Sequence, residues 1–310
     1  MKNRKKILIF LHKFPYPPKD STKFRIFYSV ILKLKETFDL QFLIVSWDTP
    51  KKEDIEFLEQ FGNIKLFIYS KWRFIVNVIL HCFSKRPFQT EMFFFKEVAE
   101  VFKELLNKSD AAYVHTVRLA KYFENISPKS REKILLDYND AISMHYLNGW
   151  KYYPFIFKLA IFIEGKKLNF YEGEILKILN NFSIVSEIDR NFILKNKISD
   201  NISSNFYITY TSVKINQEFY QNNALNSFDE DLNSNFYFIG NLKYYPNYDG
   251  INYFCKNIWP KIIEKFPNLK FYIIGSKNKK LVKKFKNYPG LVFTGFIDNP
   301  NEIIAKSLAF

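Results

Sequence analysis

The segment from residue 236 to residue 276 places the strongest constraint on how this chain folds. An apolar run at Phe236–Ile239 ends on Gly240, and a second run at Leu269–Ile274 ends on Gly275. Between the two runs, apolar residues recur at helical spacing. A helical crossover between two buried strands makes them parallel neighbours, and such sheets bind ligands outside the carboxyl ends of their strands. We therefore expect a ligand crevice beside the two glycines.

The first two thirds of the chain repeat this alternation of strands and helices. Expected strands lie at Lys6–Leu11, Leu40–Ser46, Ile64–Tyr69, 111–116, Lys133–Leu136, Phe182–Ser186 and Phe206–Thr211, and expected helices at Lys23–Thr37, Lys52–Phe61, Trp72–Phe83, Glu91–Leu106 and Tyr152–Leu179. This order is typical of a doubly wound sheet, so the predicted fold class is α/β. A polar linker at about 221–235 separates a predicted domain at 1–225 from a second one at 236–310.

Length and composition exclude other classes of protein. At 310 residues the chain can bury the cores of two domains, and an aromatic content of 19% excludes a disordered protein. The formal net charge of +15 favours anionic partners. No nucleic-acid-binding module is recognisable, so we expect no nucleic-acid partner.

The sequence predicts a cytoplasmic protein. The basic start is followed only by the short apolar run ILIFL, which predicts a strand rather than a secretory signal. Cys82 and Cys255 lie in apolar helical patterns, and we expect both to be buried free thiols in a reducing compartment. The helix Trp72–Phe83, with Arg73 near its start, either packs on the sheet or docks on an anionic membrane surface at the inner membrane face.

Three segments of the second domain carry a family resemblance. These are GNLKYYPNYDGINYFCKNIWP at 240–260, PNLKFYIIG at 267–275 and GLVFTGFIDN at 290–299. They resemble the opening half of the nucleotide-sugar-binding domain of family 4 retaining glycosyltransferases, in the sugar transferase subgroup. The resemblance implies the GT-B arrangement of two Rossmann-like domains, with the acceptor-side domain at 1–225 and a partial donor domain at 236–310. Asn247 and Asp249 can also serve simply as helix-capping residues.

The resemblance extends to a histidine at the end of a predicted strand. Residues 110–115, DAAYVH, match a family segment whose second histidine faces the sugar and the reacting phosphate oxygen. This implies His115 as the catalytic residue, because imidazole can donate or accept a proton near neutral pH. A purely structural histidine is the alternative.

Two further segments imply acceptor-binding residues. Lys23 and Arg25 follow a Pro-Tyr-Pro-Pro run at 15–18, as in the family, although Asp, Ser and Thr replace its usual glycines at 20–22. Asp137 and Asp140 lie in DYNDAIS, which also matches a family segment. These two carboxylates could order an acceptor hydroxyl or cap the following helix.

The resemblance implies an activity and a donor site. The expected donor-binding residues are Gly240, Asn241, Lys243 and Gly275. The expected enzyme is a hexosyltransferase of polysaccharide biosynthesis that moves a sugar from a nucleotide sugar to a glycan or lipid-linked acceptor with retention, using no metal and no cofactor. The acidic triplet at 229–231 is interpreted as solvated charge. Since only three strands of the donor domain are recognisable, we expect a truncated domain and doubtful activity. A non-catalytic acceptor- or partner-binding module is the alternative.

Overall fold

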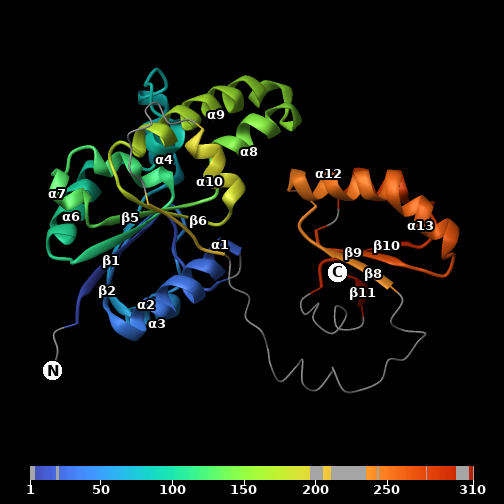
Figure 1. Ribbon diagram of the computed structural model, residues 1–310, viewed down its shortest axis with the longest axis horizontal. Coiled ribbons are helices and arrows are strands. Elements are labelled where there is room, and N and C mark those ends of the chain that lie inside the picture. Colours follow the sequence, from blue (N-terminus) through green and yellow to red (C-terminus); the bar gives the residue numbers. More distant parts are fainter. Residues whose placement is uncertain are drawn as a thin grey trace. The chain divides into compact units, whose positions relative to one another are not determined.

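The computed structural model describes residues 4–18, 21–195, 205–210, 235–242, 244–276, 278–297 and 307–309. The chain forms two compact units, Met1–Val213 and Lys214–Phe310 (Figure 1). The expected domain boundary near residue 225 and the acidic triplet at 229–231 lie outside the described residues.

The first unit contains a seven-stranded parallel sheet in the order β3-β2-β1-β4-β5-β6-β7. Its strands are β1 (Lys6–Leu11), β2 (Asp39–Ser46), β3 (Gly62–Ile68), β4 (Ala111–His115), β5 (Ile134–Asn139), β6 (Asn181–Ile184) and β7 (Asn205–Ile208). This order confirms the predicted doubly wound α/β fold. The direction of winding reverses between β1 and β4, and ligands bind at the carboxyl ends of the strands at such a switch point.

Helical segments of the first unit surround this sheet (Figure 1). They are α1 (Ser21–Phe24), the π-helical η1 (Arg25–Ile31), α2 (Leu32–Thr37), α3 (Lys52–Glu59), α4 (Lys71–Leu80), α5 (Phe88–Met92), α6 (Lys96–Asn107), the 3₁₀-helical η2 (Val117–Phe123), α7 (Pro128–Arg131), α8 (Ile142–Gly149), η3 (Trp150–Tyr152), α9 (Phe155–Ile175) and α10 (Glu187–Leu194). Alternate residues of β1 enter two separate cores. Leu8 and Phe10 pack with α6 and α9, whereas Ile9 and Leu11 pack with η1 and α3. Both faces of the sheet are therefore buried.

One expected helix is interrupted. The pattern over Glu91–Leu106 predicts a continuous helix, but the chain runs through non-helical residues between α5 and α6. Phe93 and Phe95 both enter the core there, at 1% and 5% exposure, and Phe95 has extended backbone angles. Burial of the two rings outweighs the helical pattern, because a buried aromatic side chain contributes about 2–3 kcal/mol.

The second unit contains a four-stranded parallel sheet in the order β10-β9-β8-β11. Its elements are β8 (Asn235–Ile239), α12 (Tyr245–Tyr253), the π-helical η4 (Phe254–Ile258), α13 (Trp259–Lys265), β9 (Phe271–Ile274), α14 (Lys279–Phe285), β10 (Leu291–Gly295) and β11 (Ser307–Ala309). Trp259 is fully buried at the centre of its core and donates its indole N–H to the carbonyl of Pro289 at 2.8 Å. The fourth strand, β11, extends the three that the sequence predicts.

The described helices and the cysteines bear on the localisation predictions. No helix in the described part of the chain is both long and apolar enough to cross a membrane. Cys255 is buried, as expected, but Cys82 is exposed. The prediction for Cys82 was wrong because α4 ends at Leu80 and leaves the thiol in the following turn.

Candidate functional site

A buried histidine–aspartate pair lies at the carboxyl edge of the first sheet. His115 ends β4 and is paired in register with Asp137 of β5. Its Nδ1 lies 3.0 Å from Asp137 Oδ2, and both side chains are 0% exposed. Because an ionised carboxylate only accepts hydrogen bonds, Nδ1 carries the proton and Nε2 holds a lone pair. No described group bonds to this Nε2. The catalytic role of His115 stays a prediction.

Asp137 is the centre of this site. Its carboxylate accepts hydrogen bonds from Arg25 NH1 and NH2 (2.5 and 3.0 Å), Tyr113 Oη (2.5 Å) and Ser183 Oγ (2.9 Å), besides the one from His115. Burial alone would raise the pKa of Asp137. The hydrogen bonds and positive charge of its donors outweigh burial and hold that pKa well below its usual range. Asp137 is therefore an ionised group at the bottom of the site.

Arg25 is the cation that balances Asp137. It begins η1, is 3% exposed, and also donates to Thr209 Oγ1 at 2.7 Å and to Asn139 Oδ1 at 3.3 Å. Burial lowers the pKa of Arg25, but the hydrogen bond and charge of Asp137 raise it overall. Arg25 and Asp137, two of the four predicted acceptor-binding residues, thus form a buried ion pair with each other. Direct contact of either residue with an acceptor stays a prediction.

Two residues that the sequence analysis did not select complete this edge. The imidazole of His12, just after β1, stacks on that of His115 with ring centroids 5.5 Å apart and an interplanar angle of 17°. Arg118 of η2 donates from NH1 to His12 Nε2 at 3.0 Å. Burial and the charge of Arg118 hold the pKa of His12 well below 6.5, against a weak opposite effect of the His115 backbone. Burial likewise lowers the pKa of His115, partly offset by Asp137. Both imidazoles are neutral at pH 7.

Two residues at this edge of the sheet have strained backbone angles. Thr116, directly after His115, has φ 72°, and Asn139, at the end of β5, has φ 64°. Residues with a Cβ rarely adopt this region, and they do so mainly where the surrounding structure enforces it. The Thr116 hydroxyl is buried and has no hydrogen-bond partner among the described residues. Strain and unpaired polar atoms at one strand end are typical of a functional site.

The two remaining predicted acceptor residues, Asp140 and Lys23, are more exposed than Arg25 and Asp137. Asp140 follows β5, its side chain is 36% exposed, and it pairs with His145 Nε2 at 3.5 Å. Burial raises the pKa of Asp140, but its hydrogen bond to His145 and the charge of that residue lower it overall. Lys23 lies on α1 and is half-buried. The structure thus brings Arg25, Asp137 and His115 into direct contact and leaves Asp140 and Lys23 outside that cluster.

The predicted donor residues lie at the carboxyl edge of the second sheet. Gly275 has φ 138°, and a Cβ there would lie 1.9 Å from the carbonyl oxygen of Gly240. Ser276 donates its hydroxyl proton to Asn241 Oδ1 across the same edge. Lys243 lies outside the described residues. The two glycines therefore allow the ends of β8 and β9 to approach closely.

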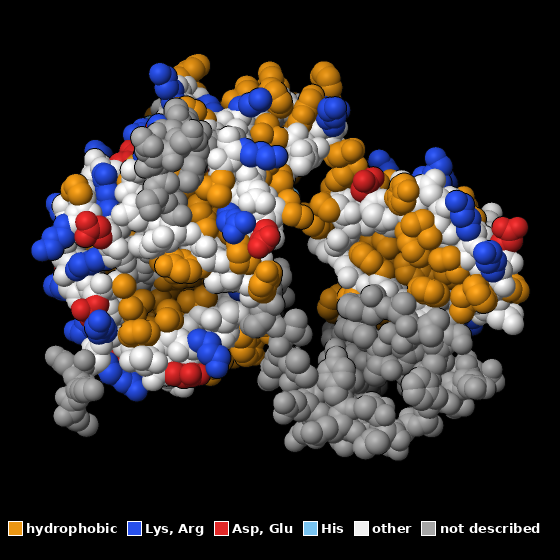
Figure 2. All heavy atoms as spheres, viewed as in Figure 1, with side chains coloured by type: hydrophobic (Ala, Val, Ile, Leu, Met, Phe, Trp, Pro, Cys, Tyr) orange, Lys and Arg blue, Asp and Glu red, His pale blue; other side chains and the backbone are white. Residues whose placement is uncertain are grey.

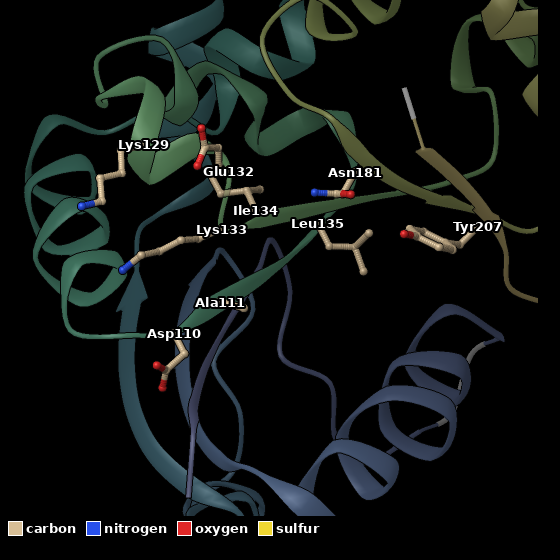
Figure 3. Close-up of a pocket in the computed structure, with 9 residues that line it drawn as sticks. All are labelled: Asp110, Ala111, Lys129, Glu132, Lys133, Ile134, Leu135, Asn181 and Tyr207. Atoms are coloured by element: carbon tan, nitrogen blue, oxygen red, sulfur yellow. The ribbon is translucent and has the colours of Figure 1, made fainter. Parts of the chain in front are cut away.

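The first unit also has a hollow on its surface (Figure 3). It is lined by residues at or before the amino ends of β4, β5 and β6, among them Asp110, Ile134 and Asn181. Ligands of parallel sheets bind at the opposite edge, so this hollow is not the candidate site. Within the described ranges, no group of three or more His, Cys, Asp or Glu side chains is arranged to hold a metal ion.

Comparisons with known proteins agree with this architecture. Residues 233–310 match the family model described as "Glycosyl transferases group 1". No curated protein sequence matches the chain significantly. The structure of Anabaena HepE in complex with UDP is similar at 9% identity and a TM-score of 0.53, over 97% of this chain and 72% of that chain. The UDP-forming α,α-trehalose-phosphate synthase of Burkholderia xenovorans is similar at 10% identity and a TM-score of 0.56, over 98% and 76%. The likeness to these solved structures shows that the fold of this chain is of the GT-B type.

Proposed function

We propose that this protein is a glycosyltransferase that moves a sugar from a nucleotide-sugar donor to a glycan or lipid-linked acceptor with retention. The observation that carries the proposal is the neutral His115, fixed by Asp137 with its Nε2 unpaired, at the switch point of a GT-B sheet. The match of residues 233–310 to group 1 glycosyl transferases supports a donor-binding second unit.

The proposed mechanism places His115 against a hydroxyl group. Its Nε2 lone pair accepts a hydrogen bond from a sugar hydroxyl and can take up the proton. Asp137 holds the imidazole in the correct tautomer and stabilises the imidazolium that would form. Arg25 keeps Asp137 ionised through their buried ion pair. We propose no role for a metal or a cofactor.

The second unit supplies the donor side of this proposal. The first helical crossover joins β8 and β9, and Gly240 and Gly275 lie at the carboxyl ends of these strands, which is where sheets of this kind bind a diphosphate. HepE, which was solved with UDP, shares this fold, and we infer a nucleotide sugar as the donor here. Asn241 beside Gly240 is the proposed side-chain contact.

Calorimetry with UDP, UDP-sugars and GDP-sugars tests the proposal. We expect one nucleotide series to bind the full chain with a Kd in the micromolar range, and turnover to release the free nucleoside diphosphate when an acceptor is present. Absence of binding to every nucleotide would contradict donor binding and favour a non-catalytic binding module. Inversion at the anomeric carbon, observed by NMR of the product, would contradict retention.

We also propose contact with an anionic membrane. Lys167 of α9 donates to the carbonyl of Ser84, so the turn that follows α4 lies against α9. Apolar side chains with basic neighbours lie exposed on these two helices and in the turns beside them, and Figure 2 shows such groups over the α8–α9 region. The exposed apolar side chains are Trp72, Ile75, Ile79, Leu80, Phe83, Phe155, Ile156, Phe157 and Leu159. Charge and apolar area together favour an anionic lipid surface.

Vesicle sedimentation tests membrane contact. We expect binding to vesicles that contain phosphatidylglycerol, weak binding to pure phosphatidylcholine, and loss of binding in the double variant Phe155→Ser/Ile156→Ser. Phe296→Ser, which removes a side chain of similar exposure (78%) from the second unit, is the control. Equal binding of the double variant and the wild type would remove α9 from the proposal.

A further inference from the structure

Arg118 is a guanidinium held in place at the edge of the candidate site. It is the second residue of η2, two positions after the strained Thr116. Its Nε donates to Gln89 Oε1 at 2.6 Å and its NH1 to His12 Nε2 at 3.0 Å. These bonds use two of the five N–H groups of a guanidinium. The other three have no acceptor in the described part of the chain.

No carboxylate pairs with Arg118 among the described residues, in contrast to Arg25. Asp140 and Glu164 lie near enough to act on it electrostatically, but both are engaged elsewhere. Glu164 accepts the backbone N–H groups that begin α5, at 2.6 and 3.0 Å, and Asp140 pairs with His145. Burial lowers the pKa of Arg118 because its charge is only partly solvated and not neutralised by contact.

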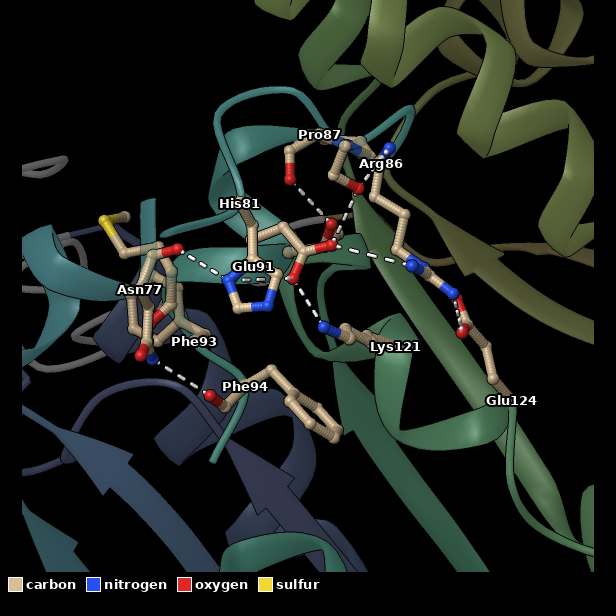
Figure 4. A network of polar contacts seen from close by, with 12 residues as sticks. Asn77, His81, Arg86, Pro87, Glu91, Phe93, Phe94, Lys121 and Glu124 are labelled. Atoms are coloured by element: carbon tan, nitrogen blue, oxygen red, sulfur yellow. Dashed lines mark hydrogen bonds and ion pairs between the residues drawn. The ribbon is translucent and has the colours of Figure 1, made fainter. Parts of the chain in front are cut away.

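The surrounding structure fixes this guanidinium before any ligand arrives. Besides the Gln89–Arg118 bond, α5 and η2 are joined by an ion pair between Glu91 Oε2 and Lys121 Nζ at 2.5 Å (Figure 4). Arg86 extends the network from Glu91 to Glu124, with bonds of 2.8 and 2.6 Å to the latter. An arginine held from two sides loses little conformational entropy on binding a ligand. Such an arrangement is typical of a recognition group.

Arg118 and His115 are connected through His12. His12 lies between them, bonded to Arg118 through Nε2 and stacked on His115. The buried atoms without a partner at this edge, among the described residues, are His12 Nδ1, His115 Nε2 and the hydroxyl of Thr116. Beside them are the N–H groups of Arg118 that its bonds to Gln89 and His12 leave unused. A hydroxyl group satisfies the lone pair of His115 Nε2, and an oxyanion satisfies the N–H groups of Arg118.

We propose that Arg118 binds an oxyanion, a phosphate or a carboxylate, carried by the acceptor whose hydroxyl contacts His115. The acceptor is therefore an anionic sugar or sugar-like alcohol rather than a neutral one. This inference rests on the proposed function, because it takes the first unit as the acceptor side. A planar guanidinium binds a phosphate and a carboxylate alike, through paired hydrogen bonds. We therefore propose an oxyanion site that accepts either group.

Calorimetry on the full chain with three probes tests the inference. The probes are glucose 6-phosphate, glucuronate and neutral glucose, and inorganic phosphate serves as a competitor. We expect at least one anionic sugar to bind about 10-fold or more tightly than glucose, which corresponds to about 1.4 kcal/mol. Glucose 6-phosphate and glucuronate separate a phosphate preference from a carboxylate preference. Equal binding of all three sugars would overturn the inference.

Variants of Arg118 test whether this residue causes the preference for anionic sugars. In Arg118→Gln we expect the anionic and neutral sugars to bind alike, whereas Arg118→Lys keeps part of the preference because it keeps the charge. Arg190→Gln is the matched control, since it removes the same charge from an arginine that bonds only to Asn191 in the described structure. An unchanged preference in a folded Arg118→Gln, or an equal loss in Arg190→Gln, would overturn the assignment.

Failure of this inference can be distinguished from failure of the proposed function. Nucleotide binding is measured in its own titration. A chain that binds UDP without preferring anionic sugars contradicts this inference and leaves glycosyl transfer standing. A chain that prefers anionic sugars through Arg118 without binding any nucleotide supports the oxyanion site and contradicts donor binding.

Discussion

The carboxyl edges of the two sheets use different parts of the polypeptide. In the first unit the edge is made of buried side chains, and positive φ angles fall on Thr116 and Asn139, which carry a Cβ. In the second unit the positive φ angles at the strand ends fall on Gly275 and Gly295. The first edge is suited to proton transfer and charge recognition by side chains. The second is suited to close approach of a ligand to the backbone. Under the proposed function, the first unit would act through its side chains and the second through its backbone.

Removal of the buried charge at the first edge should have the largest effect on stability. Asp137→Asn leaves Arg25 buried without a counter-ion, which costs about 3–5 kcal/mol. We expect the denaturant midpoint of the first unit to fall accordingly. Ser183→Ala is the control, because it removes one neutral donor to the same carboxylate and costs about 1 kcal/mol. Equal losses in the two variants would show that the charge is not the determining feature.

A side chain added at Gly275, at the carboxyl edge of the second sheet, should have the next largest effect on stability. Gly275→Ala places a Cβ 1.9 Å from the Gly240 carbonyl and requires a disfavoured φ, so we expect a loss of about 3 kcal/mol in the second unit and loss of nucleotide binding. Gly250→Ala is the matched control, since its Cβ meets no atom within 4 Å and it lies in α12, where alanine is favoured. Thermal melting and UDP titration of both variants measure the difference. Normal UDP binding in Gly275→Ala would contradict the backbone role of this edge.

The role of His115 can be tested without removing its bond to Asp137. In His115→Asn the amide nitrogen replaces Nδ1 as a donor, and the group corresponding to Nε2 is lost. We expect kcat and kcat/KM to fall together by about 100-fold or more, with a melting temperature close to that of the wild type. A folded variant with unchanged turnover would remove His115 from the mechanism. A large fall in melting temperature with normal residual turnover would make it a structural residue.

A second buried carboxyl group in the first unit, one without a cation, should make the stability of the fold depend on pH. Burial raises the pKa of Glu172 to about 8, against hydrogen bonds from the side chain and backbone N–H of Ser143. The unfolded chain ionises Glu172 near its ordinary pKa of about 4.5, so the neutral group stabilises the fold fully below that pH. This contribution is lost as pH rises to about 8.

Comparison with Glu172→Gln isolates this titration. The stability of the variant relative to the wild type should increase by roughly 1 kcal/mol per pH unit between pH 5 and 8 and level off above pH 8. Denaturant unfolding across that range measures it. A difference that does not depend on pH would mean that Glu172 is ionised in the folded protein.

The strands and the doubly wound fold class were largely accessible from the sequence. Lys6–Leu11 was predicted and is observed with the same bounds, because an uninterrupted apolar run is typical of a strand buried on both faces. The break in the expected helix at Phe93–Phe95 could not be predicted from the sequence, since it depends on which aromatic side chains pack into the core. The strand Ser307–Ala309 was also missed, because its short pattern resembles that of a helix end.

The candidate site was accessible only in part. His115, Asp137 and Arg25 were selected by resemblance to family segments, but the pattern could not show that Arg25 and Asp137 pair with each other. His12 had a usable signal. It directly follows β1, and in the observed order β1 neighbours β4, so a polar residue after β1 must lie near His115. Arg118 had no such signal, because its direction depends on the strained turn at Thr116.

The bonds of Arg25 link parts of the chain that are far apart in sequence. Its guanidinium joins Asp137, 112 positions away, and Thr209, 184 positions away, at the end of β7. Contacts across such separations form late, because each closes a long loop. The charge cluster is therefore complete only after the last strand of the seven has joined its sheet. A first unit without β7 therefore lacks the Thr209 partner of Arg25, and the guanidinium gains its full set of bonds only at the end of folding.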